Sequence, residues 1–143
     1  MRMLDVNVLV NAANPEAEEH ERYVQWLDDF VNQDEPFGLA DLVLSGFLRI
    51  VTHPKICKQP AKIEDALDFA HRLRSRANCV MIAPGRRHWD IFVGLCRKVK
   101  PRGNLVPDTY FAALAIESGS EWISADRDYA RFPGLRWRHP FDD

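Results

Sequence analysis

The chain alternates short apolar runs with longer stretches in which apolar and polar residues are mixed. Apolar runs of four to eight residues are typical of buried strands. The sequence predicts strands at residues 3–10, 80–83, 121–125 and 134–138, and a short extended piece at residues 36–40. The run at residues 80–83 is closed by Pro84 and Gly85, which favour a turn.

In the intervening stretches, apolar residues recur every three or four positions, which is the spacing of one helix face. We expect five helices, which begin at Pro15, Asp41, residue 62, residue 87 and Leu105. Proline suits a first helical turn, aspartate is a good N-cap, and Gly119 should end the fifth helix. Strands separated by helices predict an α/β fold, an α/β/α sandwich whose central, mostly parallel sheet has four to five strands and helices on both faces.

Composition places the chain among ordinary globular proteins. With 143 residues, 46% hydrophobic and 28% charged, residues 1–143 should form one domain with its own core. No apolar run approaches the ~18 residues of a membrane span, so no membrane partner is expected. The three cysteines are an odd number without a C-x-x-C spacing, which fits a reduced, cytoplasmic protein.

Charge is distributed unevenly along the chain although its net value is only -2. Residues 1–50 carry 10 acidic and 3 basic side chains, whereas residues 51–110 carry 5 acidic and 12 basic ones. The basic middle segment fits either a nucleic-acid footprint or a solvated helix face, and charge alone favours the solvated face. The candidate phosphate contacts are Arg49, Arg86, Arg87, Lys100 and Arg102. For Arg49 an ion pair with an acid of the site is an equal alternative.

Four aspartates stand where the predicted elements begin or end. Asp5 interrupts the first apolar run, Asp126 and Asp128 follow the strand at 121–125, and Asp108 lies in the first turn of the last helix. Each has a structural explanation as a helix-start or turn residue, except that a buried Asp5 costs several kcal/mol unless it is paired, protonated or metal-bound. Ligands bind outside the carboxyl ends of parallel strands, so these acids predict one cluster.

A cluster of carboxylates repels itself unless a cation neutralises it. Hard oxygen ligands select Mg²⁺ or Mn²⁺, and we expect Asp5, Asp108 and Asp126 to hold the ion. An acidic metal site beside basic surface suggests hydrolysis of a phosphodiester by a metal-activated water. Asp128 or Asp41 could orient that water.

Four blocks of the sequence, in order, resemble a known family. They are MLDVNVLVNA, DLVLSGFLRIVTHP, RGNLVPDTYFAALAIESG and ISADRDYARFPGLRW, and together they look like a PIN-domain protein of the VapC type, a toxin of bacterial toxin–antitoxin pairs. The resemblance implies a PIN-like fold, a Mg²⁺- or Mn²⁺-dependent endoribonuclease that cuts RNA, a homodimer, and inhibition by a cognate VapB-type antitoxin. It matches Asp5, Asp108 and Asp126 to family acids, Asp128 to a frequent extra acid, and Asn7 to a small polar residue that supports Asp5.

The sequence departs from the family at Gly46, where the family usually has a glutamate. Glycine supplies no ligand and weakens a helix by ~1 kcal/mol relative to alanine. Asp41 either projects into the site in its place or serves as the helix N-cap, and water could complete the metal shell without either residue. Two other functions remain open: a PIN-like binding module impaired at Gly46, and another Mg²⁺-dependent phosphoryl hydrolase with Asp5 as its nucleophile.

Overall fold

A computed structural model describes residues 1–142 of the chain. Asp143, the last residue of the expected domain, lies outside the described residues. Five strands form one sheet in the order β3-β2-β1-β4-β5, and all neighbouring strands run parallel. The strands are β1 (Arg2–Leu4), β2 (Phe37–Leu39), β3 (Cys79–Met81), β4 (Glu121–Ile123) and β5 (Trp137–Arg138). The prediction of an α/β fold with a parallel sheet of four to five strands is confirmed.

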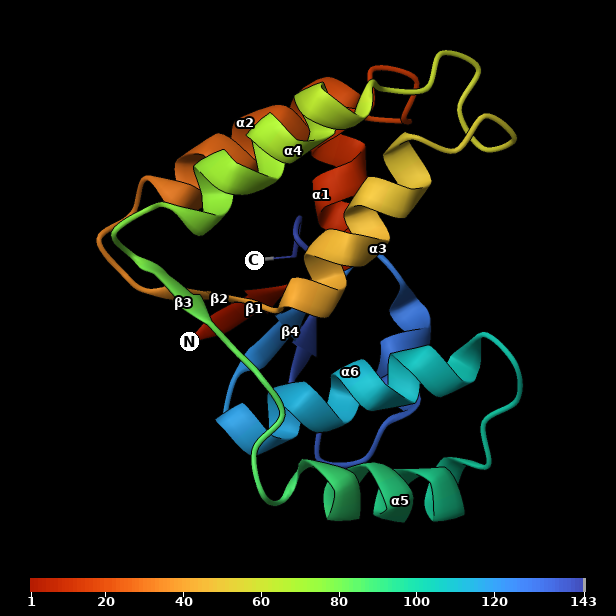
Figure 1. The fold of residues 1–143 in the computed structure, drawn as a ribbon. Coiled ribbons are helices and arrows are strands. Elements are labelled where there is room, and N and C mark those ends of the chain that lie inside the picture. The colour runs from red at the N-terminus through yellow and green to blue at the C-terminus, as the bar shows by residue number, and fades with distance from the viewer. Residues whose placement is uncertain (143) are drawn as a thin grey trace.

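Helices cover both faces of this sheet (Figure 1). One side holds α1 to α4 and the other holds α5 and α6. Their bounds are α1 (Val6–Ala13), α2 (His20–Val31), α3 (Asp41–Val51), α4 (Ile63–Arg74), α5 (His88–Val99) and α6 (Leu105–Ser118), and a short 3-10 helix, η1, spans Arg127–Arg131. Among residues 1–142, no helix combines the length and the apolar character needed to cross a membrane.

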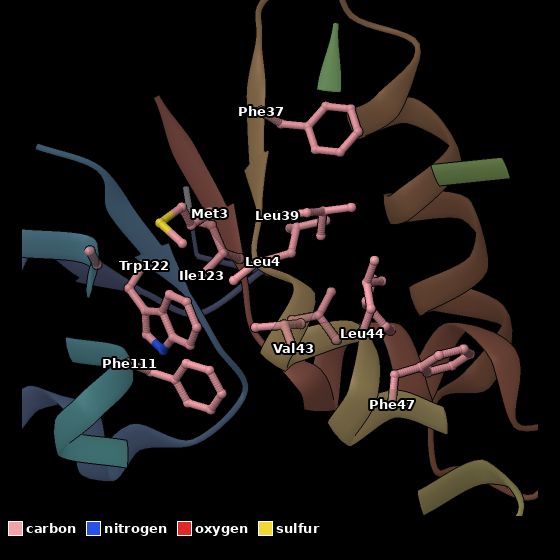
Figure 2. Packing of buried hydrophobic residues seen from close by; sticks show 14 of the residues in the cluster. Met3, Leu4, Phe37, Leu39, Val43, Leu44, Phe47, Phe111, Trp122 and Ile123 are labelled. Atoms are coloured by element: carbon pink, nitrogen blue, oxygen red, sulfur yellow. The ribbon is translucent and has the colours of Figure 1, made fainter. Parts of the chain in front are cut away.

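The core forms where the central strands are covered on both faces. Met3, Leu4, Trp122 and Ile123 of β1 and β4 are almost fully buried, as expected for strands of a parallel sheet between two helix layers. Figure 2 shows the Trp122 indole beside Phe111 of α6, and these rings stack with centroids 5.4 Å apart. On the other side of the strands, the apolar face of α3 fills the space. The sheet is therefore fixed from both sides.

The predicted strand at residues 3–10 is wrong beyond Leu4. The strand ends there, and helix α1 begins at Val6 because the carboxylate of Asp5 caps it, accepting a hydrogen bond from the Val6 N–H at 2.6 Å. The buried residues Val8 and Leu9 lie on the inner side of this helix rather than on a strand. The apolar run serves two elements, and no glycine or proline separates them in the sequence.

The helix predicted from Pro15 begins later, at His20. The segment before His20 contacts the loop after α3 instead of forming a helix. The carboxylate of Glu16 accepts hydrogen bonds there from the N–H groups of Lys58 and Gln59, each at 2.9 Å. The prediction of Asp41 as an N-cap is also wrong by one residue, because Ala40 occupies the cap and Asp41 is the first residue of α3. The other predicted elements are present within a few residues of their expected bounds.

Candidate active site

Three of the predicted acids meet at the carboxyl ends of the central strands. Asp5 and Asp126 follow β1 and β4, which are neighbours, and the Asp5 N–H still donates to the carbonyl of Ile123 at 2.9 Å. Asp108 comes from the first turn of α6. The carboxyl groups of all three line one cavity of about 620 Å³. Parallel pairing therefore brings together residues that are up to 121 positions apart.

Asp5 is the most deeply buried acid of this cluster. Its Oδ1 accepts from the Val6 N–H at 2.6 Å, and its Oδ2 accepts from the Ser124 hydroxyl at 2.6 Å and from the Asn7 amide at 3.2 Å. These donors are all neutral. Burial raises the pKa of Asp5 to about 7, and the charges of Asp108 and Asp126 add to this shift, while the bonds from Ser124 and Val6 oppose it. The carboxyl group therefore carries a proton for much of the time at neutral pH.

Asn7 and Ser124 connect the two strand ends around Asp5. Ser124 is fully buried, and its Oγ accepts from the Asn7 amide and from the Asp126 N–H, both at 3.0 Å. The Asn7 Oδ1 accepts from the Ala125 N–H at 3.0 Å. The sequence predicts Asn7 beside Asp5 but does not predict Ser124, whose only signal is a polar residue at the end of a buried run. The network holds both acids in fixed positions.

Asp108 is held from the opposite side by Tyr129. The Tyr129 hydroxyl donates to Asp108 Oδ1 at 3.1 Å, and the tyrosine ring is buried with 1% of its surface exposed. Burial raises the pKa of Asp108, and the charges of Asp126 and Asp128 raise it further. Burial and the neighbouring carboxylates also raise the pKa of Tyr129, so its hydroxyl stays protonated and can keep donating. The sequence does not predict the hydrogen bond between Tyr129 and Asp108.

Asp128 lies at the edge of the cluster and does not line the cavity. Its N–H donates to Asp126 Oδ1 at 2.9 Å, so Asp126 caps η1 in the same way that Asp5 caps α1. The Asp128 carboxylate is exposed and forms a salt bridge with Arg131 at 3.4 Å. Any contribution of Asp128 to the chemistry therefore comes from outside the cavity.

Asp41 points away from the acids. Its exposed carboxylate pairs with Arg74 of α4 at 3.1 Å, and it does not line the cavity. Gly46 does line the cavity, and a Cβ built there would lie 3.1 Å from Val6 Cγ2. The glycine thus permits the close approach of α1 and α3, and no side chain of α3 takes up the position that the resemblance assigns to a glutamate.

Of the five candidate RNA contacts, only Arg49 is brought to the acid cavity. Arg86 and Arg87 lie just before α5, and Lys100 and Arg102 lie just beyond its end. All four are exposed, and the segments that carry them adjoin the two ends of α5, which packs against α6 (Figure 1). No salt bridge among residues 1–142 involves Arg49, so its guanidinium is not committed to one of the site acids.

The donor set fits a hard divalent cation that keeps part of its water shell. Within residues 1–142, no three Asp, Glu, His or Cys side chains converge closely enough to enclose a metal ion by themselves. Mg²⁺ in proteins commonly binds through one or two carboxylates and retains several waters. Asp5, Asp108 and Asp126 offer carboxylate oxygens, and no salt bridge of the described residues neutralises them. A cation there would offset both the burial of Asp5 and the mutual repulsion of the acids.

Comparison with known proteins gives the family. The PIN domain family model matches residues 2–135. Ribonuclease VapC43 of Mycobacterium tuberculosis is 42% identical over 142 residues, covering 99% of this chain and 97% of the relative. Ribonuclease VapC25 of the same species is 33% identical over 140 residues, covering 98% and 99%.

Solved structures share the fold at lower identity. VapBC2 from Rickettsia felis, bound to a DNA fragment from its promoter, matches with a TM-score of 0.72 at 19% identity and covers 96% of this chain and 97% of that one. Mycobacterium tuberculosis VapC20, described as a sarcin-ricin loop cleaving toxin, matches with a TM-score of 0.63 at 15% identity, with coverages of 95% and 99%. The chain belongs to the PIN-domain family, and within it to the VapC ribonucleases.

Proposed function

We propose that the chain is a Mg²⁺- or Mn²⁺-dependent endoribonuclease, working as one PIN-like domain, and the toxin of a toxin–antitoxin pair. The observation that carries the proposal is the buried carboxyl of Asp5, which shares a cavity with Asp108 and Asp126 and has no cationic partner among the described residues. Burial of the ionised form of such a group costs the fold stability, so the arrangement needs an explanation in function. In a chain of the VapC ribonuclease family, metal-dependent cleavage of RNA explains the buried carboxyl of Asp5.

In this mechanism three acids share the metal ion, and neighbouring groups keep these acids in position. When bound, the divalent cation would lower the pKa of a water molecule and polarise the phosphate. Asp5, Asp108 and Asp126 would hold the ion. The Val6 N–H and the Ser124 hydroxyl keep the Asp5 carboxylate in one orientation, at 2.6 Å each. Because these supports lie within packed elements, little reorganisation is needed when RNA binds.

Tyr129 and Asp128 act on the other side of the cavity. The Tyr129 hydroxyl fixes one oxygen of Asp108, and Asp108 itself lines the cavity. The exposed Asp128 carboxylate lies close enough to raise the pKa of Asp108, and it would orient water beside the acids. Because its pKa is raised, the Tyr129 hydroxyl stays protonated and does not act as a base.

RNA would enter over Arg49. This arginine lines the cavity, and its guanidinium can hold a phosphate of the strand beside the scissile bond. Arg86, Arg87, Lys100 and Arg102 would add attraction for flanking RNA, with an affinity that falls as salt rises. Because these four residues do not line the cavity, they would serve as accessory contacts.

The partner proposals rest on the relatives. The solved structures with this fold include VapBC complexes, such as VapBC-1 from nontypeable Haemophilus influenzae and a DNA-bound VapBC from Salmonella typhimurium. We therefore propose a VapB-type antitoxin as the partner of this chain and a homodimer as its assembly. Co-expression with the antitoxin followed by size-exclusion chromatography with light scattering would measure both.

A PIN-like binding module that lost activity at Gly46 remains the second candidate. It is favoured by one observation, that neither Asp41 nor another acid of α3 takes the position of the family glutamate. The phosphoryl hydrolase with Asp5 as nucleophile is disfavoured, since both oxygens of Asp5 accept short hydrogen bonds and Asn7 is engaged by Ser124 and Ala125.

The deciding experiment measures cleavage of a pool of structured RNAs by the purified protein in Mg²⁺, in Mn²⁺ and in EDTA. We expect metal-dependent cleavage that is lost in Asp5→Ala and kept in Asp41→Ala, which removes an exposed carboxylate of the same type outside the cavity. Cleavage that survives EDTA or Asp5→Ala would contradict the proposal. If the intact protein cuts nothing, a gain of activity in Gly46→Glu would identify a disabled site.

A further inference from the structure

The acid cavity has a second wall that the metal chemistry does not use. This wall is one face of α3, formed by Leu42, Ser45, Gly46, Arg49 and Ile50, which recur at the three- and four-residue spacing of a helix. The opposite face of α3 packs in the core. At about 620 Å³, the cavity has the size of sites that bind whole small molecules, and a hydrated ion fills only a fraction of it.

Apolar side chains lie at both ends of this wall. Leu42 is 52% exposed, and Ile50 is half-buried at the other end of the face. Val6 of α1 forms the floor below Gly46, because a Cβ on that glycine would come within 3.1 Å of Val6 Cγ2. Leu42, Ile50 and Val6 thus form an apolar slot in the cavity that the three aspartates also line.

Charge decides which part of an RNA strand suits this slot. Arg49 supplies a cation that can hold a phosphate and has no acidic partner among the described residues, whereas the apolar side chains of the slot offer a phosphate no partner. A nucleobase is uncharged and has an apolar face. Proteins that recognise single-stranded RNA bind such splayed-out bases by packing against their faces and bonding to their edges. Asn104 at the rim, an exposed amide, can donate to or accept from a base edge.

We propose that the α3 wall, with Leu42, Gly46 and Ile50 at its surface, binds the unstacked base of the nucleotide next to the scissile bond while Arg49 holds its phosphate. The inference rests on the proposed ribonuclease function and adds a specificity site to it. A base in this slot would be bound before the metal site acts on the neighbouring phosphate. The choice of cleavage position would then depend on how well the base fits between α1 and α3.

The test uses ligands that contain no phosphodiester bond. The four nucleoside 5′-monophosphates are titrated, in Mg²⁺, into protein with ¹³C-labelled Leu, Ile and Val methyl groups, and ribose 5-phosphate serves as the ligand without a base. We expect nucleotides to shift the methyl resonances of Leu42, Ile50 and Val6, and ribose 5-phosphate to leave Leu42 unshifted. The methyl resonance of Ile63, an exposed residue on α4 outside the cavity, should not move.

Two variants make the result quantitative. Leu42→Ala should weaken nucleotide binding roughly fivefold, because it removes apolar surface that the base would cover. Ile63→Ala is the matched control, since Ile63 is 51% exposed and Leu42 is 52% exposed, and it should leave binding unchanged. Equal affinities of the two variants, or equal binding of nucleotides and ribose 5-phosphate, would overturn the inference.

The outcomes also separate this inference from the proposed activity. Metal-dependent cleavage that is sensitive to Asp5→Ala, together with unshifted Leu42 and Ile50 methyl groups, would refute the base site and keep the nuclease. Shifts of these methyl groups only on addition of the antitoxin would assign the slot to a protein segment and refute the base site as well. Base-dependent shifts in a protein that cuts no RNA would support the slot and contradict the nuclease.

Discussion

The buried carboxyl of Asp5 should make the metal-free protein less stable as pH rises. The folded chain holds this proton with a pKa of about 7, whereas the ordinary value is 3.8. Between these two values the unfolded chain releases the proton and the folded chain keeps it. The contribution to the free energy of unfolding is therefore fully present below about pH 4 and is lost as pH rises through 7.

The size of the effect follows from the gap between the two pKa values. One pH unit corresponds to about 1.36 kcal/mol, so a gap of about three units gives a total of about 4 kcal/mol. Asp5 is buried with 5% of its surface exposed, so solvent screens this contribution little. Domains of this kind have total stabilities of about 5–15 kcal/mol, and the loss should be easy to measure.

The assay is urea unfolding in EDTA between about pH 5 and pH 8, for the wild type and for Asp5→Asn. The variant has nearly the same shape and cannot ionise, and other groups such as His139, whose pKa burial lowers, titrate in both proteins. The difference between the two curves therefore isolates Asp5. We expect the wild type to lose stability relative to the variant by roughly 1.4 kcal/mol per pH unit up to about pH 7. Parallel curves would refute the reasoning.

Addition of Mn²⁺ should reverse the trend in the wild type alone. The ion binds the ionised carboxylate, so its stabilisation should grow between about pH 6 and pH 8. Asp5→Asn should gain little at any pH. An equal gain in both proteins would show that the ion binds elsewhere.

Two further substitutions test the groups around the acids. Ser124→Ala removes a 2.6 Å hydrogen bond that lowers the pKa of Asp5, so the pH midpoint of Mn²⁺ binding, followed by calorimetry, should rise by about one unit. An unchanged midpoint would show that Ser124 does not control Asp5. Tyr129→Phe removes the hydroxyl that bonds Asp108 at 3.1 Å, and Mn²⁺ affinity should fall roughly tenfold while the fold is kept. Unaltered affinity would leave Tyr129 a packing residue only.

The sequence predicts an element well where its two ends carry clear signals. Helix α6 spans residues 105–118 as predicted, because an apolar stretch ends at Gly119, which adopts φ 67°. The first element carries no such signal. Residues 3–10 are apolar apart from Asp5 and Asn7, and the break after Leu4 depends on a hydrogen bond from the Val6 N–H to Asp5, which sequence patterns do not reveal.

The candidate site divides in the same way. The meeting of Asp5 and Asp126 follows from the rule that neighbouring parallel strands end at one edge, and Asp108 joins them from the predicted start of α6. Ser124 and Tyr129 reach their acids across 119 and 21 residues, and only the folded chain shows these contacts. A serine at the end of a strand and a tyrosine in a turn are common in any protein, so their residue types alone could not reveal these roles.

Asp5 combines roles that explain why its burial is tolerated. It ends β1, and its carboxylate faces the first N–H of α1, where the positive end of the helix dipole favours the ionised form. The dipole and the Ser124 hydroxyl only partly offset burial, since the pKa still lies at about 7. The metal-free protein can thus hold Asp5 neutral. A cation that enters at or below neutral pH must displace this proton, so metal binding and proton release are coupled at Asp5. Because Asp5 also caps α1, both events act on the junction between β1 and α1.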